Sequence, residues 1–175
     1  MTKAIGARTP TLSVRGFTLI ELLIVVALIG ILSAIAAPLL IAAKSSANEA
    51  SAVQTLRTLV SAQSTFSNVC GSGAYTTSLT MLVTERFASP DLDITPKSGF
   101  SFELVGALGS KAAGADCTGQ PTRTGFYFRA EPLDTTTGRR GFATNHVGTI
   151  WQDTSGVAPP EPFVAAGTVA PIEGL

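Results

Sequence analysis

One long apolar run lies near the N-terminus of the chain. Within residues 17–43 the only side chains that are neither apolar, glycine nor proline are Thr18, Glu21 and Ser33. A helix of about 20 apolar residues crosses a bilayer, so this run is long enough to span one. A carboxylate inside such a helix costs about 2.5 kcal/mol or more on insertion scales, and no partner for Glu21 is apparent within the run. We therefore expect Glu21 to have a function.

The pattern becomes amphipathic after Ala43, with no glycine or proline before Gly71. Apolar residues recur at steps near three and four with one gap, at Ala47, Ala50, Val53, Leu56, Val60 and Phe66. Polar residues fall between them, namely Asn48, Glu49, Gln54, Arg57 and Ser61. This period predicts a single helix over residues 17–69, about 80 Å long, whose second half has one apolar face. We expect the helix to end at Gly71-Ser72-Gly73.

Pro38 lies inside this predicted helix. Proline has no backbone N–H and clashes with the carbonyl four residues earlier, so we expect a kink or a locally unwound segment there. Gly30 adds a second weak point, and neighbouring helices can satisfy the freed backbone groups in a membrane. A simple kink without a functional role is the alternative.

Short strand-like segments fill the C-terminal half. Four are expected, at residues 100–105, 125–130, 142–145 and 148–152, and the second alternates most clearly because Phe126, Phe128 and Ala130 share one face. The last two are close enough for a tight antiparallel hairpin. We expect a short helical turn at residues 79–85.

Two other segments are expected to lack strands. Residues 109–122 are rich in glycine, alanine, serine and threonine, which indicates a loop. Residues 157–175 contain Pro159, Pro160, Pro162 and Pro171, so we expect an extended surface segment.

Charge and cysteine content indicate export of the C-terminal part. Lys3, Arg8 and Arg15 precede the apolar run, and Lys44 is the only base close to its other end. The positive-inside rule then keeps the N-terminus in the cytoplasm. The two cysteines, Cys70 and Cys117, would meet an oxidising compartment, where one disulfide is the natural prediction and two buried free thiols the alternative. Closing this loop would stabilise the fold by about 4 kcal/mol.

Residues 15–26, Arg-Gly-Phe-Thr-Leu-Ile-Glu-Leu-Leu-Ile-Val-Val, resemble the class III signal of type IV pilins and type II secretion pseudopilins. The resemblance implies that a prepilin peptidase cuts between Gly16 and Phe17 and methylates the new N-terminal Phe17. It also implies that Glu21 serves assembly by pairing with the amine of Phe17. The 16-residue leader is longer than is usual for type IVa pilins.

The same resemblance extends to the helix and the head. Gly30 and Pro38 stand where type IV pilins often carry glycine and proline, which implies that this segment loses helical structure when subunits pack into a filament. It implies an α+β pilin-like fold, in which the second half of the long helix packs on an antiparallel sheet of about four strands. The implied organisation is a leader at 1–16, a membrane and filament-core helix at 17–43, its amphipathic half at 44–70, a head at 71–156 and a proline-rich tail at 157–175.

The implied function is a structural subunit of a type IV pilus-like filament. Its partners would be copies of itself, the prepilin peptidase, the assembly platform in the bacterial inner membrane and membrane lipid. The head would be exported and end on an extracellular pilus or, in the pseudopilin alternative, a periplasmic pseudopilus. A second alternative is a membrane-anchored enzyme or binding domain. A secretory signal cut after Ala36 is disfavoured, because Glu21 would lie in its hydrophobic core.

Other chemistries have little support in the sequence. Six arginines are scattered over the head with one adjacent pair, so nucleic-acid binding is not indicated: Arg57, Arg86, Arg123, Arg129, Arg139 and Arg140. His146 stands alone in a predicted turn without a nucleophile motif, so no catalytic residue is predicted. Asp134 and Asp153 flank turns, but no run of closely spaced oxygen ligands suggests calcium. We therefore predict no enzyme activity, metal or cofactor.

Overall fold

The computed structural model describes residues 16–92 and 96–172. These residues form two compact units that divide after Leu39. The expected leader lies outside the described residues except for Gly16. Within the described part, the predicted α+β class is confirmed, with one long N-terminal helix and an antiparallel sheet after it.

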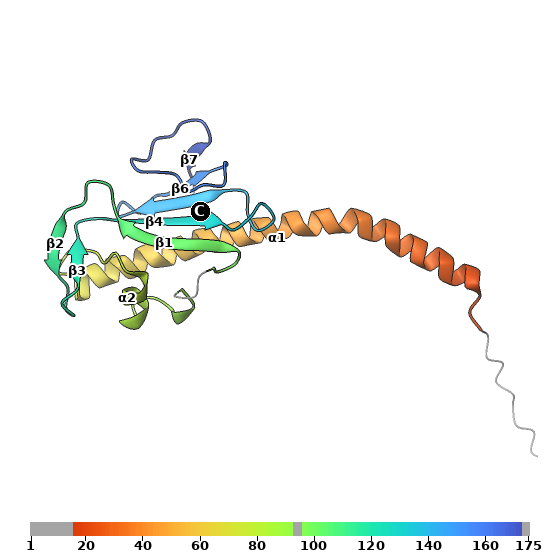
Figure 1. Ribbon diagram of the computed structural model, residues 1–175, viewed down its shortest axis with the longest axis horizontal. Coiled ribbons are helices and arrows are strands. Elements are labelled where there is room, and N and C mark those ends of the chain that lie inside the picture. The colour runs from red at the N-terminus through yellow and green to blue at the C-terminus, as the bar shows by residue number, and fades with distance from the viewer. Residues whose placement is uncertain (1–15, 93–95, 173–175) are drawn as a thin grey trace, which may run out of the picture. The chain divides into compact units, whose positions relative to one another are not determined.

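The first unit consists of the start of helix α1, which spans Leu19–Val69 (Figure 1). All described side chains from Gly16 to Lys44 are exposed, and this part of α1 is long and apolar enough to cross a membrane. Gly30 and Pro38 both lie within continuous helix. The expected unwound segment is therefore not present in this state of the chain.

The second unit is a helix packed on a sheet. The five strands pair antiparallel in the order β1-β4-β5-β6-β7. Their bounds are Phe100–Gly106 for β1, Phe126–Pro132 for β4, Gly141–Asn145 for β5, Ile150–Asp153 for β6 and Val169–Pro171 for β7. Helix α2 (Leu79–Thr84) and a 3₁₀ turn η1 (Pro90–Leu92) lie between α1 and β1 in the chain.

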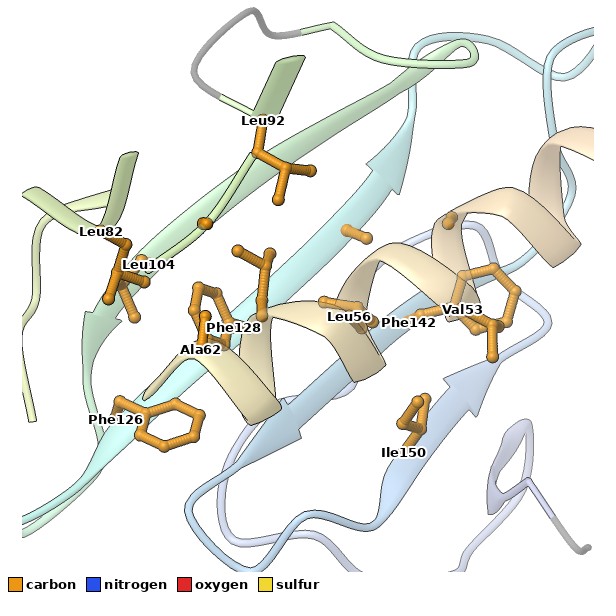
Figure 2. Packing of buried hydrophobic residues seen from close by; sticks show 14 of the residues in the cluster. Val53, Leu56, Ala62, Leu82, Leu92, Leu104, Phe126, Phe128, Phe142 and Ile150 are labelled. Carbon is orange, nitrogen blue, oxygen red and sulfur yellow. The ribbon is translucent and has the colours of Figure 1, made fainter. Parts of the chain in front are cut away.

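Aromatic side chains fill the space between α1 and the sheet. Leu56, Leu59 and Phe66 of α1 are completely buried, and Figure 2 shows Leu56 among the phenylalanines of the strands. The strands supply Phe100, Phe126, Phe128 and Phe142, each at most 1% exposed. Full burial of one such side chain stabilises the fold by about 1.5–3 kcal/mol. The alternation predicted for β4 is confirmed, because Phe126, Phe128 and Ala130 all face this core.

The apolar stripe predicted for the second half of α1 was partly wrong. Ala47 and Ala50 are exposed, whereas Glu49 is buried on the same face as Val53 and Leu56. Exposing an alanine side chain to solvent costs little free energy. The buried Glu49 carboxylate, in contrast, is paired with charged and backbone groups of the head. The contact face of the helix is thus rotated from the one that hydrophobicity alone selects.

The expectation that the tail forms no strand was wrong. Residues Val169–Pro171 add β7 to the edge of the sheet, where Trp151 pairs with Pro171. Proline is tolerated on an edge strand because it need not donate to a further neighbour. The next residue restores the ladder, since Ile172 N–H donates to the Ile150 carbonyl at 2.9 Å. The three other prolines lie in the connection before β7, where Pro159 is fully buried.

The loop predicted at 109–122 also contains regular structure. Strands β2 (Ala112–Ala115) and β3 (Pro121–Arg123) pair into a small separate sheet. Cys117 lies between them and forms a disulfide with Cys70, which follows the end of α1. Cys117 N–H also donates to the Cys70 carbonyl at 3.0 Å, so this loop is tied to the helix end by a covalent bond and a hydrogen bond.

Candidate functional site

The candidate site is the start of α1, where the predicted cleavage point meets the first helical turn. Gly16, Phe17 and Thr18 are not helical, and α1 begins at Leu19. The first helical bond runs from Leu22 N–H to the Thr18 carbonyl, 3.3 Å apart. Thr18 is therefore the N-cap residue of the helix.

Glu21 has a partner after all, contrary to the expectation from the sequence. The Thr18 N–H and the Thr18 hydroxyl both donate to Oε2 of Glu21, at 2.9 and 2.8 Å. In return, the Glu21 N–H donates to Oγ1 of Thr18 at 3.2 Å. This reciprocal arrangement is a capping box, and its sequence signature, threonine followed three residues later by glutamate, was readable in advance.

The other predicted residues of this segment are Phe17, Gly30 and Pro38, and all three are exposed. Phe17 is 85% exposed and adjoins the peptide bond to Gly16. The predicted pair between a Phe17 amine and Glu21 concerns the chain after cleavage and stays a prediction. Gly30 and Pro38 lie further along the same exposed stretch of α1. A Cβ added at Gly30 would meet no atom of the described residues, so no contact among them explains its small size.

A second cluster, which sequence reasoning missed, joins α1 to the sheet through Glu49. Oε1 of Glu49 accepts the backbone N–H groups of Arg139 and Arg140 at 2.7 and 3.2 Å. Oε2 lies 2.8 Å from Nε and 2.7 Å from Nη2 of Arg140, and Arg140 Nη1 donates to Gln152 at 2.7 Å. Four donors thus satisfy a carboxylate that is 5% exposed. The available signal was the position of Glu49, four residues before Val53 on the apolar face.

The remaining candidates show no reactive arrangement. His146 is exposed in the turn between β5 and β6. Thr136 and Thr137 hydrogen bonds to Asp134 lower the pKa of that carboxyl, and the Ser155 N–H bond likewise lowers the pKa of Asp153 despite the opposing effect of burial. Within residues 16–92 and 96–172, no three histidine, cysteine, aspartate or glutamate side chains gather as a metal site.

Comparison with known families bears on the first of these sites. Residues 12–37 match the model described as the prokaryotic N-terminal methylation motif, which is the class III prepilin signal of type IV pilins and pseudopilins. No curated protein and no solved structure matches the chain. The long helix packed on an antiparallel sheet is consistent with the pilin fold. The chain thus carries a prepilin signal, followed by a long helix and an antiparallel sheet.

Proposed function

We propose that this protein is a structural subunit of a type IV pilus-like filament. The observation that carries the proposal is the methylation motif at residues 12–37 opening onto a helix whose side chains all stay exposed as far as Lys44. Such an apolar surface needs lipid before assembly and neighbouring helices after it. The subunit is held in the inner membrane as a precursor, and its apolar helices then form the filament core.

The processing step supplies the positively charged partner that the Glu21 carboxylate lacks in the precursor. Cutting between Gly16 and Phe17 creates an amine on Phe17, which lies four residues before Glu21 and can reach it within one helix. In a packed bundle the amine of a neighbouring subunit can replace this internal partner. An opposite charge offsets the cost of burying the carboxylate and fixes the axial register between subunits.

In this proposal, the middle of the apolar helix allows the filament to stretch. Gly30 and Pro38 weaken the helix between them, and both lie in the first unit, on the exposed stretch of α1. The segment is helical in the single subunit and loses helical structure when neighbours pack around it. Peptidase, assembly platform and lipid are the partners of this cycle, and the head itself performs no catalysis.

A pseudopilin of type II secretion is the second candidate, because pseudopilins carry the same prepilin signal. Both functions use the same cleavage and the same helix packing. They differ in where the filament stands, which is outside the cell for a pilus and in the periplasm for a pseudopilus. Imaging of shed or surface fibres by electron microscopy, with antibody against the head, separates the two.

The decisive test is the mass of the assembled subunit. Sheared or membrane-extracted filaments should yield a chain that begins with N-methyl-Phe17. Cleavage after Ala36, or an uncleaved chain, would refute the proposal.

Replacing Glu21 by alanine tests assembly separately from processing. We expect Glu21→Ala to be cut at the same bond and its filament yield per cleaved subunit to fall at least tenfold, because the neighbouring amine has lost its partner. Yield is measured by immunoblot of the sheared fraction. Glu103→Ala, which removes an exposed carboxylate of the head, is the matched control and should assemble normally.

A further inference from the structure

We propose that Thr18 is a positioning residue for leader cleavage, because it ends α1 just before the peptide bond that is cut. The inference rests on the proposed function, since it requires cleavage between Gly16 and Phe17. The observation behind it is that residues 16–18 are not helical while the capping box of Thr18 and Glu21 closes the helix at Leu19.

The spacing explains why this boundary matters for the scissile bond. An α-helix joins each N–H to the carbonyl four residues earlier. If α1 extended backward by one turn, the Ile20 N–H would take the Gly16 carbonyl and the Glu21 N–H would take the Phe17 carbonyl. The Gly16 carbonyl is the group that must be attacked. A helix that included it would have to open before cleavage could occur.

With the capping box in place, the helix does not need to extend backward to find acceptors for its first N–H groups. The first N–H groups of a helix have no partner within it, and an apolar environment offers no water to replace one. Thr18 Oγ1 takes the Glu21 N–H, and the Glu21 carboxylate takes the Thr18 N–H. Without the threonine hydroxyl, upstream carbonyls become the available acceptors. Neither Gly16 nor Phe17 forbids a helix as proline would.

The reaction served by this geometry is a peptide hydrolysis. The oxygen of a water molecule adds to the carbonyl carbon of Gly16, and the bond from that carbon to the Phe17 nitrogen breaks. Gly16 leaves with a carboxylate, and the Phe17 nitrogen takes up a proton to become a free amine. Thr18 contacts none of these atoms and acts only through the conformation of the chain.

The test compares initial cleavage rates of full-length precursors in membranes with purified prepilin peptidase, followed by the mobility shift of the lost leader. Thr18→Val keeps the shape but loses the hydroxyl, and we expect a rate about fivefold lower, the scale of a lost helix cap. Thr18→Ser and Thr18→Asn keep a capping oxygen and should stay within about twofold of the original rate. An unchanged or faster rate for Thr18→Val would overturn the proposal. So would a slow Thr18→Asn beside a fast Thr18→Ser, which indicates direct recognition of the hydroxyl.

A second measurement reads the helix boundary itself. Solid-state NMR of the full precursor in bilayers, with a ¹³C-labelled Gly16 carbonyl, should show a shift toward the helical value in Thr18→Val and none in Thr18→Ser. An unshifted carbonyl in Thr18→Val would contradict the inference. If the unmodified chain is never cut at Gly16, the proposed function fails, whereas the NMR result still decides whether Thr18 sets the helix start.

Discussion

Helix α1 carries two carboxylates, Glu21 and Glu49, and their hydrogen-bond partners differ. Glu21 closes a capping box on an exposed part of the helix, whereas Glu49 is buried against the head by two backbone N–H groups and the guanidinium of Arg140. A buried carboxylate without partners would cost several kcal/mol, so the donors around Glu49 are a condition of this packing. The position of Glu49 therefore fixes which face of α1 meets the sheet.

Removing the Glu49 carboxylate should destabilise the head markedly. Glu49→Ala leaves two backbone N–H groups and the half-exposed Arg140 without their acceptor, and we expect a loss of about 2 kcal/mol of unfolding free energy. The measurement is urea unfolding of the detergent-solubilised protein, followed by near-ultraviolet circular dichroism. Glu103→Ala breaks the exposed pair with Arg129 and should cost less than about 1 kcal/mol. Equal losses for the two variants would contradict this account.

Acid should lower the stability of the loop that contains Cys117, because it protonates the Asp116 carboxylate. Burial raises the pKa of Asp116, but hydrogen bonds from Thr118 and from the Gln120 N–H outweigh it, and the net pKa lies below the ordinary 3.8. A lowered folded-state pKa contributes stability that is full above 3.8 and lost as pH falls below it. Asp116→Asn should therefore flatten the dependence of stability on pH between about 2 and 4. Thermal unfolding across this range checks it, and an unchanged slope would count against the assignment.

At the scale of elements, sequence periodicity predicted the helix and the alternating strand well. Phe126, Phe128 and Ala130 show a plain period of two, and α1 has no helix breaker between Pro38 and its end. Strand β7 escaped prediction because its stability comes from pairing with β6, which local sequence does not show. The prolines before it suggested an unpaired segment, although Pro159 is buried and its carbonyl accepts a hydrogen bond from the Tyr127 hydroxyl of β4.

The segment before β7 should be held by its aromatic contact with β6. Phe163 stacks on Trp151 with ring centroids 5.4 Å apart and an angle of 15°. Phe163→Ala should cost about 1 kcal/mol of unfolding free energy and shift the fluorescence of the single tryptophan to longer wavelength. Val164→Ala, at a side chain that is 61% exposed, is the neighbouring control. A fluorescence spectrum that Phe163→Ala leaves unchanged would show that the stack does not shield Trp151.

At the scale of the whole molecule, the exposed and the buried apolar side chains fall largely in different units. The exposed apolar side chains are concentrated before Leu40, whereas the core cluster lies entirely after it. The sequence itself shows a change in composition after Ala43, a few residues beyond the division between the units. The candidate site was predictable only in part, because the sequence motif names Glu21 but the partner of Glu49 comes from a segment about 90 residues away.

A chain that begins at Leu40 should therefore fold as a soluble monomer. It keeps the buried face of α1, the Glu49 cluster and both cysteines. We expect monomeric elution in size-exclusion chromatography and the same tryptophan spectrum as the full protein in detergent. A chain that begins at Val53 lacks Glu49 and is the control that should be less stable. Aggregation of the longer chain would show that the first unit is needed for the fold.

The disulfide joins Cys70 and Cys117, which are 47 positions apart, and the ring that it closes includes α2, β1 and β2. The proposed function exports the head from the cytoplasm, where proteases can cut it. A single nick anywhere within this ring leaves both new ends joined through the sulfur bridge, so no fragment is shed and the strands can remain paired. The bridge thus keeps a chain that is cut once within the ring in one covalently joined piece.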